Sequence, residues 1–288
     1  MARKKKKSVR PRSSAASKSL AAEAYKQSVK ELFFEEEPSK PGGDFQDFLV
    51  LLYGPPKIGK SELARRIDGI YFLPTEPGFK FFSSRKTKIP NWATFIAFIK
   101  KMEKHPKMVA QVKMWCIDTA DNLSKFCMQY ACGRANIAHP TDEEWGKGWE
   151  AFRDEFSHWF LRLAALGPGI IAISHEKQRE VISRSIKITK DSPAMPTTTF
   201  VILNNLCDVI LHMSFAKKKG KRDPVRALFT KPTETRDAGD RTGMLPAVIF
   251  FKDEQDAINQ ILEAYEPEKA KKKGKVKKKR RKKKKSKK

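Results

Sequence analysis

Both ends of the chain lack acidic residues. Eight basic residues fall within residues 1–18 and sixteen within residues 269–288, of a total of 60 basic and 33 acidic residues in 288. The 36 basic and 33 acidic residues in between give the middle a net charge of only about +3. Dense blocks of one charge repel and bury little apolar surface. The sequence therefore predicts disordered basic arms, residues 1–19 and 268–288, around a nearly neutral folded part.

The composition of these arms indicates a polyanionic partner. Polycationic segments attract nucleic acid by releasing condensed counterions, and we expect direct contact with nucleic acid. Anionic membranes or ribosomes would attract them too, and a solubilising or nuclear-import tail is the plainer interpretation. The acid-free start also resembles an organelle transit peptide in composition, but its lysine block differs from the spaced arginines of such peptides.

Cysteine is scarce, and long apolar runs are absent. The four cysteines show neither CxxC spacing nor a nearby histidine pair, which argues against a zinc site and a disulfide framework. No stretch of eighteen apolar residues occurs, so no transmembrane helix and no membrane partner are expected. We expect a cytoplasmic protein, in the host cytoplasm if the chain is viral and possibly in the nucleus of a eukaryotic host.

Helical and strand patterns alternate along the middle of the chain. Residues 20–34 have helical spacing and residues 35–44 form a Pro/Gly-rich linker, so we expect an appended helix before a domain at residues 45–267. Near-continuous apolar strands between helices favour a mainly parallel sheet covered on both faces, followed by an antiparallel pair. The predicted strands are residues 48–54, 69–76, 112–119, 169–174, 207–215 and 225–231; the predicted helices are residues 60–67, 91–104, 121–132, 143–166 and 253–265.

A phosphate-binding pattern stands where the first strand gives way to a helix. "GPPKIGKS", Gly54 to Ser61, matches GxxxxGK followed by Ser or Thr, in the strand–loop–helix context that makes the pattern meaningful. We expect Lys60 to reach the outer phosphates of ATP and Ser61 to bind Mg²⁺. The predicted nucleotide-binding residues are Gly54, Pro55, Pro56, Lys57, Ile58, Gly59, Lys60, Ser61, Glu62 and Arg241.

Three further polar residues end predicted strands. Asp118 follows "MWCI" and is expected to hold Mg²⁺, although it could also cap the next helix. Glu76, in "FLPTEPG", is expected to be the catalytic carboxylate, against the alternative of an ordinary surface glutamate. His175, in "AISHEK", is predicted to sense the γ-phosphate, but a purely structural histidine would look the same.

Two basic segments follow. Residues 179–198 read as a basic loop or hairpin that contacts single-stranded DNA or merely connects two elements. The Gly-rich segment "TETRDAGDRTGMLP" contains Arg236 and Arg241. One of these could act as an arginine finger on a neighbouring subunit's nucleotide, or both could be ordinary surface residues.

In combination, "LLYGPPKIGKS", "FLPTEPG", "WCIDTADNL", "AISHEK" and "RDAGDRTGMLP" resemble the phage RecA-like P-loop ATPases, including the Sak-type single-strand annealing group. The likeness runs from about Phe48 to Phe251. It implies a RecA-like core that binds ATP and Mg²⁺, assembles as a homo-oligomer on single-stranded DNA and assists recombination or replication. By the same resemblance Lys60 and Ser61 bind phosphate and metal, Asp118 the metal, and Glu76 the attacking water.

Other functions remain open at this point. An AAA+ loader or helicase-like motor needs a helical lid, and few residues follow Met244. A non-hydrolysing nucleic-acid-binding module would keep the P-loop only as structure. A small-molecule kinase is weaker still, because no acceptor-pocket motif is evident and the basic arms would have no role.

Overall fold

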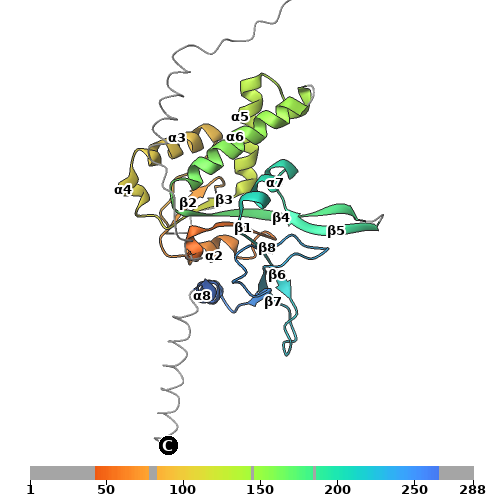
Figure 1. Cartoon of the computed structure of the whole chain (residues 1–288). Helices are drawn as coiled ribbons and strands as arrows, with labels where there is room; N and C mark the ends of the chain where they lie inside the picture. The colour runs from red at the N-terminus through yellow and green to blue at the C-terminus, as the bar shows by residue number, and fades with distance from the viewer. Residues whose placement is uncertain (1–42, 78–82, 144–145, 184–185, 266–288) are drawn as a thin grey trace, which may run out of the picture. The chain divides into compact units, whose positions relative to one another are not determined.

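The computed structural model describes residues 43–77, 83–143, 146–183 and 186–265 (Figure 1). The predictions for the basic arms, the appended helix and Trp145 lie outside these residues. The described residues form one nine-stranded sheet. Its strands are β1 (Leu49–Gly54), β2 (Ile70–Pro74), β3 (Met114–Asp118), β4 (Gly169–Ser183), β5 (Ile186–Pro193), β6 (Val209–Ala216), β7 (Val225–Phe229), β8 (Gly239–Asp240) and β9 (Val248–Phe250).

The strand order places β1 at the centre. The sheet runs β2-β3-β4-β1-β6-β7-β9, and β5 and β8 pair with β4 and β6 respectively. The first five strands of that order are parallel, whereas β7 and β9 continue the sheet in antiparallel fashion. The predicted α/β class, with a mainly parallel sheet and a C-terminal antiparallel extension, is confirmed. Strand β4 inserted between β1 and β3 brings three strand ends to one edge.

Helices cover both faces of the sheet, as the apolar strands require (Figure 1). Alternating strand residues divide between two cores: Leu51 and Ala172 face one, Val50 and Ile171 the other. The first core packs against α3 (Trp92–Glu103), α5 (Ala120–Ala135), α6 (Lys147–Ala164) and α7 (Thr197–Leu206). The second packs against α2 (Lys60–Arg65) and α8 (Glu254–Tyr265). Between α3 and β3 lies the short α4 (Pro106–Val109).

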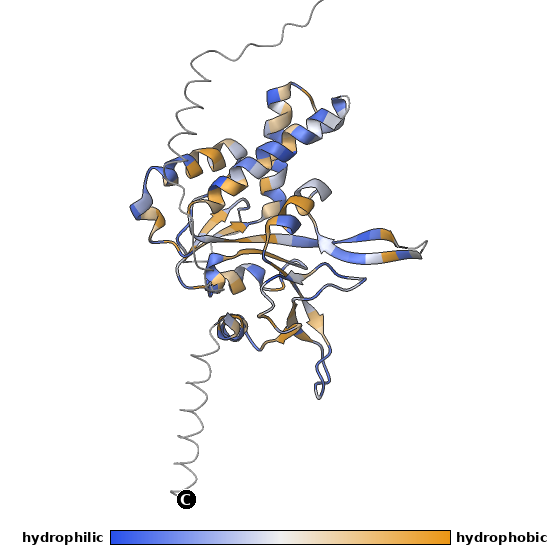
Figure 2. Cartoon of the chain, in the orientation of Figure 1, coloured by the Kyte–Doolittle hydropathy of each residue, from blue (hydrophilic) through white to orange (hydrophobic). Residues whose placement is uncertain are grey.

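The aromatic stripe predicted after residue 143 belongs to the core. Phe152, Phe156, Trp159 and Leu163 of α6 are buried in the first cluster, and Trp149 packs against it. The four cysteines are also buried and free. Figure 2 shows apolar segments gathered where the helices meet the sheet. Packing therefore accounts for the stripe.

The segment after His175 is more regular than a loop. Strand β4 continues to Ser183 and pairs with β5 in an antiparallel hairpin that extends beyond the body of the sheet (Figure 1). The Pro/Thr-rich stretch that follows begins α7, a helix that the sequence patterns did not predict. The predicted hairpin is therefore present up to Pro193, and contact of residues 179–198 with single-stranded DNA stays a prediction. Within the described residues, no helix is both long and apolar enough to cross a bilayer.

Candidate functional site: a phosphate-binding pocket at the carboxyl edge of the sheet

The loop between β1 and α2 forms the floor of the site. Gly59 has a φ of 112°, a left-handed conformation that favours glycine, and α2 begins at the next residue. A Cβ on Gly54 would lie 2.2 Å from the carbonyl oxygen of Met213. Both glycines are thus fixed by backbone geometry and close packing, and the first turn of α2 directs its N–H groups into the loop.

Lys60 is buried, with 5% of its surface exposed. Its Nζ donates hydrogen bonds of 2.8 Å to the carbonyl oxygens of Gly54 and Pro55. Burial lowers the pKa of Lys60, and the nearby Asp118 carboxylate opposes this shift. An ammonium group folded back against its own loop is positioned to exchange these carbonyls for phosphate oxygens.

Asp118 stands at the end of β3 and faces the loop. Its Oδ2 accepts a hydrogen bond of 2.5 Å from Ser61 Oγ. Burial raises its pKa to about 6, and the bond from Ser61 opposes that rise. The predicted pair of metal ligands therefore meets in space.

Glu76 lies two residues beyond the end of β2, so the strand is shorter than expected. Its Oε1 accepts hydrogen bonds from Thr119 Oγ1 at 2.9 Å and from Asn122 Nδ2 at 3.0 Å. The Nε2 atom of His175 is 3.6 Å from the same oxygen. Three neighbours thus fix the carboxylate at the pocket, while about a third of its side chain stays exposed.

These side chains enclose a pocket of about 260 Å³. It is lined by Lys57, Gly59, Lys60, Ser61, Glu62, Glu76, Asp118, Thr119, Ile173 and His175. Other predicted residues act differently: Pro55 offers a carbonyl to Lys60, and Pro56 is exposed. Ile58 buries its side chain in the second core.

Arg241 does not line the pocket. Its guanidinium donates to the carbonyl oxygen of Asn205 at 2.6 Å, and its backbone N–H donates to that of Asp208. Asp208 precedes β6, so Arg241 lies at the opposite, amino-terminal edge of the parallel strands. A contact between Arg241 and nucleotide needs another subunit, as the arginine-finger hypothesis has it, and stays a prediction.

Sequence reasoning missed Asp121. This buried residue in the first turn of α5 accepts hydrogen bonds from Ser174 Oγ at 2.6 Å and from the backbone N–H of His175 at 2.8 Å. Burial raises the pKa of its carboxyl, and the bonds from Ser174 and His175 oppose the shift. Asp121 therefore ties the end of β4 to the helix that follows Asp118. An acid three residues after the strand-end aspartate was the available signal.

A second missed group lies beside the pocket. His212 Nε2 is 2.5 Å from Glu176 Oε2, and His212 Nδ1 accepts a hydrogen bond of 2.9 Å from Arg236 Nε. Burial and the Arg236 charge lower the pKa of His212 to about 4. Glu176, Asp191 and His212 lie close enough together to suggest a cation site. The donor Arg236 fixes the Nε2–H tautomer, however, so that nitrogen donates to Glu176 and offers no lone pair to a metal.

Arg236, the other predicted finger, is thus engaged within its own chain. Its guanidinium also lies 3.6 Å from the centre of the Phe229 ring. Two of the basic hairpin residues are held in a similar way. Arg179 donates to the carbonyl oxygens of Pro193 and Met195, and Lys190 pairs with Asp237 at 2.6 Å.

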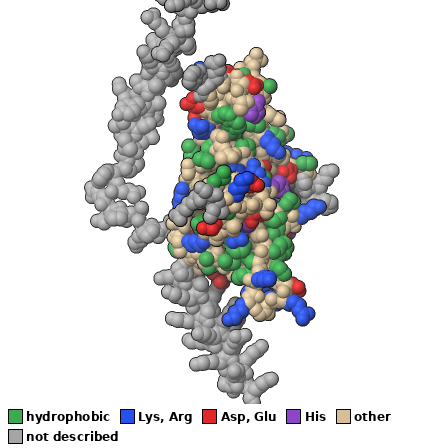
Figure 3. All heavy atoms as spheres, turned by 90° about the vertical axis from the view of Figure 1, so that its right-hand side faces the viewer, with side chains coloured by type: hydrophobic (Ala, Val, Ile, Leu, Met, Phe, Trp, Pro, Cys, Tyr) green, Lys and Arg blue, Asp and Glu red, His purple; other side chains and the backbone are tan. Residues whose placement is uncertain are grey.

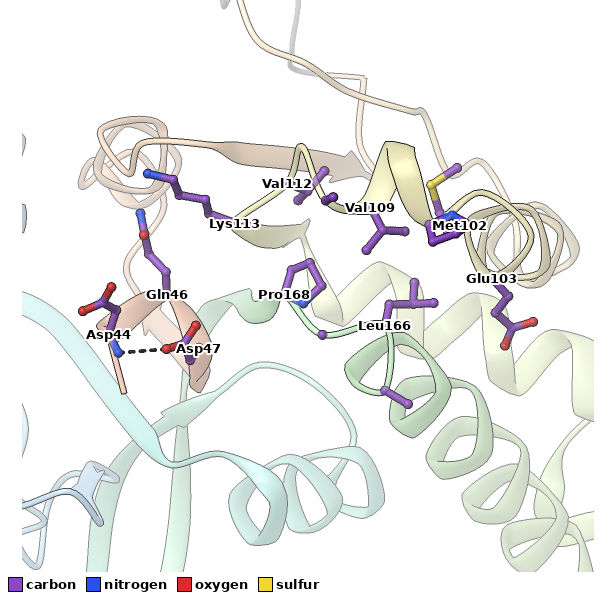
Figure 4. Close-up of a pocket in the computed structure, with 14 residues that line it drawn as sticks. Asp44, Gln46, Asp47, Met102, Glu103, Val109, Val112, Lys113, Leu166 and Pro168 are labelled. Carbon is purple, nitrogen blue, oxygen red and sulfur yellow. Dashed lines mark hydrogen bonds between the residues drawn. The ribbon is translucent and has the colours of Figure 1, made fainter. Parts of the chain in front are cut away.

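A larger pocket, of about 780 Å³, lies at the amino-terminal edge (Figure 4). Met102, Val109 and Leu166 contribute apolar surface to it, and Asp44 and other acids stand at its rim. Its only cationic lining residue among those described, Lys113, is paired with Asp68 at 2.6 Å. Acids at the rim and no free cation make this pocket unsuitable for phosphate, despite its size.

The donor set of the smaller pocket fits a magnesium ion. Ser61 Oγ and Asp118 Oδ2 are both oxygen ligands, the kind that Mg²⁺ prefers, and they face the same space. A glycine-rich cradle, a buried lysine and a strand-end aspartate on adjacent elements define the nucleotide site of a P-loop NTPase.

Comparison with family models extends this assignment. Residues 47–242 match the AAA_24 model, described as AAA domain, and the chain belongs to this family. The family and the fold confirm the coarser part of the resemblance, a RecA-like P-loop ATPase. The phage, Sak-type single-strand annealing group stays a prediction. No curated protein matches the sequence.

Two solved structures illustrate the distant structural similarities. The RadB recombinase aligns at 17% identity and a TM-score of 0.42, over 75% of this chain and 91% of that one. Flagellar accessory protein FlaH from Methanocaldococcus jannaschii aligns at 14% identity and a TM-score of 0.40, over 74% and 88%.

Proposed function

We propose that this protein is a Mg²⁺-dependent ATPase that acts on single-stranded DNA as a homo-oligomer, in phage recombination or replication. The observation that carries the proposal is the convergence of Lys60, Ser61, Asp118 and Glu76 on one pocket. A small-molecule kinase would need an acceptor site next to the phosphates, and no described residue supplies an evident one. Residues 245–265 form only β9 and α8, which leaves the described part without the lid of an AAA+ motor.

Each residue has a role that follows from its position. Lys60 binds the outer phosphates, and the N–H groups of the loop bind the remaining phosphate oxygens. Ser61 and Asp118 would hold Mg²⁺, which supplies neutralisation of phosphate charge. Glu76 orients water and accepts its proton, since Thr119 and Asn122 hold the carboxylate in place.

His175 is proposed as the sensor. Its ring faces Glu76, and its backbone opens the hairpin formed by β4 and β5. A change in the contacts of the His175 side chain would therefore shift the position of the hairpin. The arms at residues 1–19 and 268–288 supply most of the positive charge for DNA, and residues 179–198 remain a proposed contact.

The experiment is a comparison of Lys60→Ala with the wild-type chain. Isothermal titration calorimetry should detect ATP binding by the wild type in Mg²⁺ buffer and at least a hundredfold weaker binding by the variant. ATP turnover measured with and without single-stranded DNA then separates an ATPase from a binding module. Turnover that Lys60→Ala leaves unchanged would overturn the proposal.

A further inference from the structure

The turn between β6 and β7 concentrates positive charge. Residues 217–224, "KKKGKRDP", contain five basic residues, all exposed, and one acid, Asp223. None of the five forms an ion pair with any residue that the structure describes. In Figure 3 Lys and Arg side chains gather on the lobe at the lower end of this face, where Figure 1 places the turn. These cations are free to meet an external anion.

This distinguishes the turn from the β4–β5 hairpin. The Arg179 guanidinium is bonded to backbone carbonyls within the protein, and Lys190 is paired with Asp237. Lys187 lies 3.9 Å from Glu180. Arg179, Lys187 and Lys190 of the hairpin therefore have hydrogen-bond or ionic partners already. In the turn, Lys218 lies over the Phe250 ring at 5.2 Å, and none of the five cations is paired with an acid among the described residues.

An aromatic ring stands at the base of the turn. Phe215, near the end of β6, is 59% exposed, so its ring is accessible from solvent. Exposed aromatic rings beside free cations are the combination that binds single-stranded nucleic acid, since bases stack on the ring and phosphates meet the cations. Duplex DNA buries its base faces and would leave Phe215 unused.

The strand that leaves the turn reaches the nucleotide site. Arg226, paired with Phe215 across β6 and β7, donates a hydrogen bond of 3.1 Å to the carbonyl oxygen of Ile58 in the phosphate-binding loop. It also pairs with Glu254 of α8. The side chain of Arg226 thus connects the strand that follows the turn to the P-loop, and the turn and the P-loop lie at the same edge of the sheet.

We propose that the β6–β7 turn and Phe215 form a further contact of the folded domain for single-stranded nucleic acid, besides residues 179–198. The inference rests on the proposed function for its partner, and it adds a site that the basic arms do not explain. Phosphates bind Lys217, Lys218, Lys219 and Lys221, and a base stacks on Phe215.

The test measures anisotropy of a fluorescein-labelled oligo-dT with the full chain at several salt concentrations. The turn variant changes Lys217, Lys218, Lys219 and Lys221 to Gln. A matched control changes four exposed lysines elsewhere, Lys101, Lys104, Lys107 and Lys125, to Gln, so that both variants lose the same charge. Phe215→Ala and Lys219→Glu are tested singly, and circular dichroism melting checks that each variant folds.

Near 0.1 M salt, the turn variant should bind about 25-fold more weakly if two phosphates are lost and several hundredfold if four are lost, with a shallower salt slope. Phe215→Ala should weaken oligo-dT binding by about five- to a hundredfold and leave a duplex of the same length almost unaffected. The matched control should lose far less affinity for oligo-dT than the turn variant.

Equal affinities for the turn variant and the control would overturn the inference and leave the proposed ATPase standing. A wild-type chain that binds no oligo-dT would overturn both this inference and the DNA part of the proposed function. ATP binding that is lost in Lys60→Ala tests the nucleotide part independently.

Discussion

Ser61 Oγ and Asp118 Oδ2 are 2.5 Å apart, although 57 positions separate the two residues in the sequence. Strand β4, inserted between β1 and β3, sets the distance that this hydrogen bond bridges. The bond holds a carboxylate whose pKa is raised by burial and, to a smaller extent, by the charge of Glu76. Ser61 and Asp118 would hold a divalent cation, whose charge would offset the cost of burying this carboxylate.

Replacing Asp118 by Asn is expected to stabilise the nucleotide-free protein at pH 8. The pKa of Asp118 is raised from 3.8 to about 6, so the folded state holds the proton more tightly than the unfolded chain. The contribution of Asp118 to the free energy of unfolding is therefore greatest below about pH 4, and it is lost as the pH rises through 6. We expect a gain of about 1–3 kcal/mol at pH 8 and none at pH 4, measured by urea unfolding in EDTA.

Asp68→Asn is the control for this experiment, because Asp68 is an exposed carboxylate paired with Lys113. Asp68→Asn should not raise the free energy of unfolding at either pH. An Asp118→Asn variant that is less stable at pH 8 than at pH 4, relative to wild type, would contradict the burial argument.

Replacing Glu76 by Gln should separate ATP binding from turnover. The amide keeps the size of the side chain but cannot accept the proton of an attacking water. We expect turnover to fall by about 10²–10⁴-fold while the affinity for ATP changes by less than about threefold. Phosphate release and calorimetry measure the two quantities, and Glu150→Gln, at an exposed position of α6, is the control. Retained turnover in Glu76→Gln would remove Glu76 from the mechanism.

Asp121→Asn tests a positioning role. The amide offers one acceptor where the carboxylate accepts from both Ser174 and His175, so one bond is lost and the end of β4 can shift. We expect kcat to fall by about 10- to 100-fold with KM for ATP little changed, because the phosphate loop is not touched. Ser174→Ala, which keeps the bond to His175, should have a smaller effect. A loss confined to KM would indicate a different role.

Replacing His212 by Gln should change how stability depends on pH. The pKa of His212 is lowered from 6.5 to about 4 by burial and by the charge of Arg236. Its neutral form stabilises the fold above about pH 6.5, and this contribution is lost as the pH falls through 4. The difference in the free energy of unfolding between wild type and His212→Gln should therefore decrease by up to about 3 kcal/mol from pH 7 to pH 4.

Urea unfolding at three pH values measures this difference, and His105→Gln, at an exposed position, is the control. A difference that stays constant with pH would show that His212 does not resist protonation in the fold.

The phosphate-binding loop and Asp118 could be predicted because their signals are local. Each is a short polar pattern directly after an apolar run, so a few adjacent residues are enough to recognise both the strand and the site at its end. Helix α7 was missed because its run of threonines after a proline lacks a strong helical pattern. The hydrogen bond from Arg226 to Ile58 joins residues far apart in the sequence, and so does the network around His212. Only the packed sheet brings these residues together.

Strand β4 passes without interruption from the nucleotide pocket, where His175 pairs with Gly54, to the outer end of its hairpin (Figure 1). A small tilt at the base of such a long two-stranded ribbon would produce a larger displacement at its outer end. Ile182, the most exposed large apolar side chain among the described residues, is a site for an introduced thiol, because the four native thiols are buried. A dye attached there would report on nucleotide occupancy from a distance.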